Sequence, residues 1–243
     1  MTDLFVNKLD EELSLLSIQL EEYQKKQFFD YYEILVEWNK VMNLTAITEM
    51  DEVITKHFVD SLSLVKAVED IKEKSYVIAD VGTGAGFPGI PLKIAFPQLE
   101  ITLMDSLNKR VKFLNEVITK LGLEKISTVH GRAEDCGRNP EYREKYDLVV
   151  SRAVANLSTL SEYCMPFVKV GGKFISYKSG KVEEELQSAK HAIFLLGGKL
   201  DGCESFLLPG SDAERTLVKI HKVDGISKKY PRKAGMPSKE PLK

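Results

Sequence analysis

The amino-acid sequence predicts an α/β protein: a doubly wound sheet of seven strands preceded by an N-terminal helical extension. Three observations predict it. Apolar residues recur at helical spacing through residues 1–74, short apolar runs alternate with helical segments from residue 75 onward, and the first of these runs leads through a glycine-rich turn into a helix. We therefore expect a helical extension over residues 1–74 and a sheet domain over residues 75–243 that ends in a basic segment.

Two apolar stripes and a turn organise the extension. Leucines at helical spacing mark a first helix over residues 4–20, and an aromatic stripe marks a second over residues 28–38. Residues 43–47, Asn-Leu-Thr-Ala-Ile, interrupt the period because Asn and Thr favour turns. Asp51 then predicts the cap of a third helix, in which His57 is expected to be a structural histidine bonded to the sheet domain.

The sheet domain begins with short apolar runs that predict buried parallel strands. These runs are Tyr76–Asp80, Ile101–Asp105, Ile126–His130, Asp147–Ser151 and Lys173–Tyr177. Helices are predicted over Ile90–Phe96, Lys109–Leu121, Leu157–Val170 and Val182–Leu196, each ended by proline or glycine. The last two strands, Leu200–Leu208 and Thr216–Val223, flank Pro209-Gly210 and predict an antiparallel hairpin. Five parallel strands with an antiparallel strand inserted at one edge are expected.

Composition restricts the class of protein. Hydrophobic residues are 43% and charged residues 29% of the chain, as in folded globular proteins. The longest uncharged stretch, Val81–Leu92, is too short to span a bilayer and the N-terminus has no signal-peptide pattern, so we expect a cytoplasmic protein without a membrane partner. The histidines and cysteines show no metal-ligand spacing, and no metal site is predicted.

The distribution of charge is uneven. The formal charge is −2, but residues 1–52 carry 4 basic and 12 acidic side chains, whereas residues 228–243 carry 6 basic and 1 acidic. A nearly neutral total therefore hides a basic segment that is compatible with a nucleic-acid partner.

A glycine-rich turn after the first strand predicts a ligand site. Asp80 ends the strand, and Gly82 and Gly84 permit positive φ and close approach to the backbone before the next helix begins. The alternative is a plain strand-to-helix turn. A nicotinamide dinucleotide is disfavoured because Phe87 stands where its fingerprint needs glycine. Asp105, at the end of the second strand, is placed to accept hydrogen bonds from both hydroxyls of a ribose.

At these residues the sequence resembles the glucose-inhibited division protein B family of small-subunit ribosomal RNA guanine-N7 methyltransferases. The resemblance rests on six blocks that follow one another over nearly the whole chain. They are Asn43-Leu-Thr-Ala-Ile, His57-Phe-Val-Asp-Ser-Leu, Asp80–Leu92, Gly131-Arg-Ala-Glu-Asp, Ser151-Arg-Ala-Val-Ala and Tyr230-Pro-Arg-Lys-Ala-Gly.

The resemblance implies a class I, Rossmann-like methyltransferase fold that uses S-adenosyl-L-methionine and releases S-adenosyl-L-homocysteine. It implies cofactor contacts from the loops after the first four strands: Gly82, Phe87, Asp105, Ser106, Leu107, Ala133, Glu134 and Arg152. Asp80 and Gly84 are predicted cofactor contacts from the glycine-rich turn itself. Arg152 is also a candidate to contact a substrate phosphate, or it could merely cap a strand end. The implied substrate is 16S ribosomal RNA or the small ribosomal subunit, and a monomer is expected.

The chemistry expected from the resemblance needs no general base, because guanine N7 carries a free lone pair near neutral pH. Catalysis would then rest on positioning. Two alternatives remain open: a methyltransferase of a ribosomal protein or small molecule, and a cofactor-binding interaction module without turnover.

The basic C-terminal segment predicts RNA contacts. Lys228, Lys229, Arg232 and Lys233 surround Tyr230 and Pro231, and Arg232 is expected to grip a phosphate with its planar fork. The alternative is a frayed, solvated tail, in which case the basic face would lie around Lys109, Arg110 and Lys178. Lys178 is included among the predicted RNA contacts.

Overall fold

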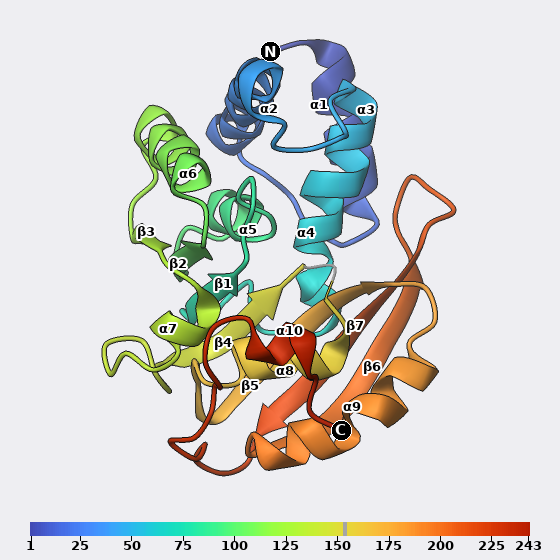
Figure 1. Cartoon of the computed structure of the whole chain (residues 1–243). Helices are drawn as coiled ribbons and strands as arrows, with labels where there is room; N and C mark the ends of the chain where they lie inside the picture. Colours follow the sequence, from blue (N-terminus) through green and yellow to red (C-terminus); the bar gives the residue numbers. More distant parts are fainter. Residues whose placement is uncertain (153–154) are drawn as a thin grey trace.

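A seven-stranded sheet forms the centre of the computed structural model, which describes residues 1–152 and 155–243 (Figure 1). The strand order is β3-β2-β1-β4-β5-β7-β6. The strands are β1 (Val77–Val81), β2 (Glu100–Asp105), β3 (Ile126–His130), β4 (Tyr146–Ser151), β5 (Val168–Ser179), β6 (Gly198–Leu207) and β7 (Glu214–Lys222). Neighbouring strands from β3 to β5 pair in parallel, and β7 is antiparallel to both β5 and β6. The predicted sheet class and terminal hairpin are confirmed.

Helices cover both faces of the sheet. One face carries the N-terminal helices α1 (Asp3–Ser14), α2 (Glu22–Met42), α3 (Met50–Val53), η1 (Ile54–Val59), α4 (Asp60–Leu62) and η2 (Ser63–Lys66), together with α5 (Gly89–Ala95) and α6 (Asn108–Leu121) (Figure 1). The other carries α8 (Leu157–Cys164) and α9 (Glu183–Leu195). Two short helices, α7 (Ala133–Cys136) and α10 (Met236–Lys239), lie near α8.

Period-two alternation along the strands builds two hydrophobic cores. On β1, Ile78 belongs to the cluster under the N-terminal helices, whereas Ala79 belongs to the cluster under α8 and α9. Phe5 of α1 and Leu103 of β2 are both fully buried in the first cluster, so the N-terminal helices share a core with the sheet. The boundary at residues 74 and 75 stays a prediction.

Several element boundaries differ from those expected. The first helix ends at Ser14 rather than at residue 20, and the second extends from Glu22 to Met42. The helix predicted over Leu157–Val170 ends at Cys164, and β5 begins at Val168 and runs through Gly171-Gly172, the expected helix stop. Gly171 has φ +86°, which a glycine accommodates within a strand. The third helix begins at Met50 after Glu49, and the segment around His57 is a π-helical turn.

No helix in the described part of the chain is long and apolar enough to cross a bilayer. Within the same residues, no group of His, Cys, Asp and Glu side chains is arranged to hold a metal ion.

Candidate active site

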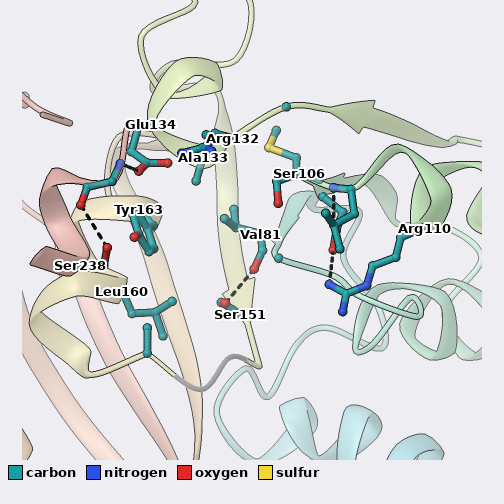
Figure 2. A pocket seen from close by; sticks show the side chains of 17 residues that line it. Val81, Ser106, Arg110, Arg132, Ala133, Glu134, Ser151, Leu160, Tyr163 and Ser238 are labelled. Carbon is teal, nitrogen blue, oxygen red and sulfur yellow. Dashed lines mark hydrogen bonds and ion pairs between the residues drawn. The ribbon is translucent and has the colours of Figure 1, made fainter. Parts of the chain in front are cut away.

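A cavity of about 470 Å³ opens at the carboxyl ends of β1, β2, β3 and β4 (Figure 2). Figure 2 shows Glu134, Tyr163 and Ser238 on one side of this cavity and Ser106 and Arg110 on the opposite side. Parallel α/β sheets bind ligands at this edge, and the volume suits a nucleoside-sized molecule. Six residues expected at a cofactor line it: Gly82, Asp105, Ser106, Leu107, Ala133 and Glu134.

The glycine-rich loop leaves room for a ligand at Gly82. Its φ is +74°, and a Cβ placed on it would meet no protein atom within 4 Å. The loop is held on β2, because the Gly82 amide donates to the Met104 carbonyl at 2.9 Å and the Gly84 amide donates to Asp105 Oδ2 at 3.0 Å. Gly84 therefore positions the loop rather than lining the cavity.

Asp105 is a buried carboxylate at the end of β2. Its Oδ2 accepts from Gly84 and, at 3.3 Å, from Arg110 Nη1, and its Oδ1 accepts from the Leu107 amide at 2.9 Å. A carboxylate offers about four lone-pair positions. At least one position on Oδ1 thus remains for a ligand hydroxyl, which suits the predicted contact with a ribose.

Asp80 supports the glycine-rich loop and does not line the cavity, so its direct contact with the cofactor stays a prediction. Its Oδ2 accepts from Thr83 Oγ1 at 2.6 Å and from the Gly89 amide at 2.8 Å, whereas its Oδ1 has no partner among the described residues. Complete burial raises the pKa of Asp80 to about 6, although both hydrogen bonds oppose the rise.

Asp80→Asn should therefore change the pH dependence of stability. Between the ordinary pKa of 3.8 and the folded value of about 6, the folded protein holds a proton that the unfolded chain has lost. The free energy of unfolding of the native protein therefore falls as the pH rises through this window. A pKa difference of this size corresponds to roughly 3 kcal/mol. Urea denaturation at pH 4 and at pH 7 measures the free energy of unfolding of both proteins. Relative to the native protein, the variant should become more stable by about this amount when the pH is raised from 4 to 7. An equal difference at both pH values would contradict the assignment.

Phe87 packs toward the N-terminal helices, and its contact with the cofactor stays a prediction. Its ring stacks on His57 with 4.4 Å between centroids, and the Arg152 guanidinium lies 5.0 Å from its centroid. Phe87 is buried and packs against Tyr31 of α2. It joins the glycine-rich loop to the N-terminal helices instead of lining the cavity.

Arg152 is bound within a buried polar cluster. Its Nη1 donates to Asp60 Oδ2 at 2.8 Å and to the Lys56 carbonyl at 3.1 Å, and its Nη2 lies 3.2 Å from His57 Nδ1. Asp60 also accepts from Arg215 Nε at 2.8 Å. Arg152 does not line the first cavity, and its contact with the cofactor stays a prediction. The following residues of its motif, Ala153 and Val154, lie outside the described residues.

A second cavity, of about 650 Å³, adjoins the first at Ala155, which lines both. Its wall includes cationic side chains from η1, β5 and β7 and from the end of β4: Lys56, Arg152, Lys178 and Arg215. Lys178 is paired with Glu185 at 2.6 Å and donates to the Ala155 carbonyl at 2.8 Å. The second cavity is therefore lined by cations, and at least Lys178 among them is held in place by hydrogen bonds to neighbouring protein groups.

The basic C-terminal residues divide into two groups. Lys228 and Lys233 are exposed, and Lys229 is exposed with its ammonium 5.0 Å from the Tyr230 ring centroid. The guanidinium of Arg232 is bonded to the buried carboxylate of Glu162, at 2.7 Å for Nη2 to Oε2. It would have to leave Glu162 to bind a phosphate with both nitrogens, and its RNA contact stays a prediction.

Sequence reasoning did not assign several residues that line the first cavity, among them Arg110, Tyr163, Gly235 and Ser238. Arg110 carried a signal, because it lies five residues after Asp105 on the following helix. Gly235 is the last residue of the block Tyr230-Pro-Arg-Lys-Ala-Gly, so the resemblance marked it without placing it at the cavity. Ser238 carried no signal, since it comes from the far end of the chain and reaches the cavity only through the tertiary fold.

The family model GidB, described as rRNA small subunit methyltransferase G, matches residues 24–216. The chain belongs to this family. A Ribosomal RNA small subunit methyltransferase G of Lachnoclostridium phytofermentans is 57% identical over 230 residues, which are 95% of this chain and 94% of the relative. One of Lactobacillus johnsonii is 51% identical over 231 residues, 95% and 97% of the two chains. The predicted family is confirmed.

Solved structures support the fold of this family member. M. jannaschii TYW2 in complex with AdoMet superposes with a TM-score of 0.52 at 17% identity, over 68% of this chain and 77% of that one. The YcgJ protein from Bacillus subtilis superposes with a TM-score of 0.51 at 12% identity, over 70% of this chain and 100% of that one. These similarities concern the fold, and they confirm the predicted class I methyltransferase architecture.

Proposed function

We propose that this member of the GidB family transfers a methyl group from S-adenosyl-L-methionine to N7 of a guanine in 16S ribosomal RNA. The observation that carries the proposal is the pair of adjoining cavities at the carboxyl edge of the sheet. The first has the space and the acceptors for a nucleoside, and the second is lined by four cationic side chains.

The residues of the first cavity fit S-adenosyl-L-methionine. Asp105 has a free acceptor position for a ribose hydroxyl, Ala133 and Glu134 line the β3 side, and Gly82 leaves open space beside β1. The bound cofactor supplies an electrophilic methyl group on a sulfonium. If Asp105 held the ribose and Ala133 and Glu134 the adenine, the methyl group would be supplied on the side of β1 and β4, where Ala155 lines both cavities.

The second cavity is the proposed acceptor site. Its cations are Lys56, Arg152, Lys178 and Arg215, and its carboxylates are Asp60 and Glu185. Such a surface attracts a polyanion, and Asp60 and Glu185 fix the direction of the cations. The exposed Lys228, Lys229 and Lys233 are proposed as further RNA contacts. A protein or small-molecule acceptor remains the alternative, and no observation favours it.

No residue beside these cavities needs to act as a base. Burial and the Arg152 charge lower the pKa of His57 to about 3, so its ring is neutral and accepts from Arg152 at physiological pH. Catalysis by alignment alone can supply roughly 7 to 11 kcal/mol.

The single-turnover rate of methyl transfer should consequently show no rising limb between about pH 6 and 9 at saturating RNA. The measurement is a rapid-quench rate with labelled cofactor at each pH. A rate that rises tenfold per pH unit across this window would indicate a general base and a different target atom.

A transfer assay with labelled S-adenosyl-L-methionine tests the substrate. We expect label in 16S ribosomal RNA, offered free or within small ribosomal subunits, and none in ribosomal protein. Label in protein, or in a small molecule, would contradict the proposal. A monomer acting in the cytoplasm, where these substrates are made, completes the proposal.

A further inference from the structure

The chain ends in a strap, residues 226–243, which crosses α8 and reaches the first cavity (Figure 1). The strap is fastened at its start by Arg143. The Arg143 Nη2 donates to the Ile226 carbonyl at 3.0 Å, and Nη1 donates to the Tyr230 carbonyl at 2.9 Å. Tyr230 is buried in the core beneath α8 and α9. The strap is therefore packed on the domain, not frayed.

A buried ion pair fixes the middle of the strap. Glu162 of α8 is fully buried, and it accepts from the Arg232 backbone amide at 2.7 Å and from its guanidinium at 2.7 to 3.1 Å. Among the described residues no other group donates to Glu162. A buried carboxylate is costly unless it is paired, so the position of Arg232 is strongly determined.

Beyond Arg232 the strap bonds to the edge of the cavity. The Gly235 amide donates to Glu134 Oε1 at 2.7 Å, and Thr159 Oγ1 donates to the Pro237 carbonyl at 3.0 Å. Gly235 has φ +83°, a conformation that favours glycine. Gly235 and Ser238 thereby form part of the cavity wall on the side of Glu134 and Tyr163 (Figure 2).

We propose that the strap is a part of the cofactor site, in which Gly235 and Ser238 contact the adenosine half of the ligand and Arg232 is a positioning residue that acts through Glu162. The inference rests on the proposed function, which assigns this cavity to S-adenosyl-L-methionine. The Gly235 amide bonds to Glu134, and Figure 2 shows Ser238 on the side of Glu134 and Tyr163 rather than beside Val81 of β1 and Ser151 of β4.

This arrangement gives the strap a specific thermodynamic effect. S-adenosyl-L-methionine, S-adenosyl-L-homocysteine and 5′-methylthioadenosine share the adenosine half and differ at sulfur. A substitution in the strap should weaken the binding of all three ligands by the same factor. A substitution at Gly82, on the β1 side, should weaken the binding of S-adenosyl-L-methionine and S-adenosyl-L-homocysteine more than that of 5′-methylthioadenosine.

Ser238→Trp tests the wall directly. Ser238 is exposed on the short helix α10, so we expect the fold to tolerate a large ring there. Because Ser238 also lines the first cavity, the ring should occupy part of the space assigned to the ligand. We expect at least a roughly tenfold higher Kd for each of the three ligands by calorimetry. Lys239→Trp is the matched control, because Lys239 is the exposed neighbour and does not line the cavity. An unchanged Kd for Ser238→Trp would overturn the proposal.

Arg232→Ala tests the positioning role against the RNA-binding role expected from charge alone. We expect an increase of at least about fivefold in the KM for S-adenosyl-L-methionine, with kcat at saturating cofactor and the salt dependence of RNA affinity unchanged. Arg232→Lys should recover part of the loss, because it keeps the charge opposite Glu162. Lys243→Ala removes an exposed cation of the same strap that is not among the proposed RNA contacts, and it should leave the cofactor KM unchanged.

If Arg232→Ala does not fold, the pair Glu162→Gln with Arg232→Gln keeps the site neutral and permits the same measurement. An unchanged cofactor KM, with an RNA salt slope flattened by about 0.7 to 0.9, would overturn the positioning role and restore the phosphate contact. Gly82→Val separates this failure from failure of the proposed function. If Gly82→Val leaves cofactor affinity unchanged, the cavity is not the cofactor site and the proposed function fails. If Gly82→Val abolishes cofactor binding while the strap variants leave it unchanged, only the assignment of the strap fails.

Discussion

Replacing Gly82 by valine is expected to weaken the binding of S-adenosyl-L-methionine by at least about 100-fold. Gly82 has φ +74°, and a Cβ there would enter open space at the cavity. A β-branched side chain would occupy the volume assigned to the ligand, and the left-handed backbone would cost it roughly 1 to 2 kcal/mol in addition. Calorimetric titration of the folded variant measures the loss.

Gly122→Val is the matched control for backbone strain. Gly122 ends α6 with φ +61°, and a Cβ there also meets nothing within 4 Å, but the residue lies outside the cavity. Both variants should lose stability, and only Gly82→Val should lose the ligand. Equal affinity in the two variants would show that the glycine-rich loop does not face the cofactor.

Arg152→Ala should lower the free energy of unfolding by roughly 3 kcal/mol. The guanidinium is a donor to Asp60, to the Lys56 carbonyl and to His57, and it stacks on Phe87. Its removal leaves the buried Asp60 with Arg215 as its remaining ionic partner. The contacts join β4 to the N-terminal helices, so this loss reports on their attachment.

Urea denaturation without ligand measures this loss. Arg110→Ala is the comparison, because Arg110 is one-third exposed and its bond to Asp105 is long, at 3.3 Å. That variant should change stability by less than about 1 kcal/mol. If Arg152→Ala were as stable as the native protein and lost only cofactor affinity, the role first expected from its motif would stand instead.

The sequence predicted which loops meet at the cavity better than which side chains point into it. Gly82, Asp105 and Glu134 follow three strands that the apolar runs identified, and the carboxyl ends of parallel strands share one edge. A sequence motif specifies the order of residues along the chain, but it does not specify the direction in which each side chain points. Phe87 therefore turns toward His57, although it belongs to the same block as Gly82.

The remaining differences come from partners that are distant in sequence. Arg232 is one of a cluster of cations in the sequence, but its partner Glu162 lies 70 residues away, as the only charged residue of α8. Gly171-Gly172 is typical of a helix stop, whereas β5 pairs with β4 on both sides of these glycines, at Val168 and from Lys173 onward, across a register shift. Local pattern cannot report either pairing, because both depend on the assembled sheet.

The most direct test of the function is the 7-methylguanosine content of 16S ribosomal RNA, measured by mass spectrometry in cells that lack this protein and in cells that regain it. We predict that the deletion removes one 7-methylguanosine, that the native chain restores it, and that Gly82→Val does not while Gly122→Val does. An unchanged 7-methylguanosine content in the deletion, or full restoration by Gly82→Val, would contradict the account.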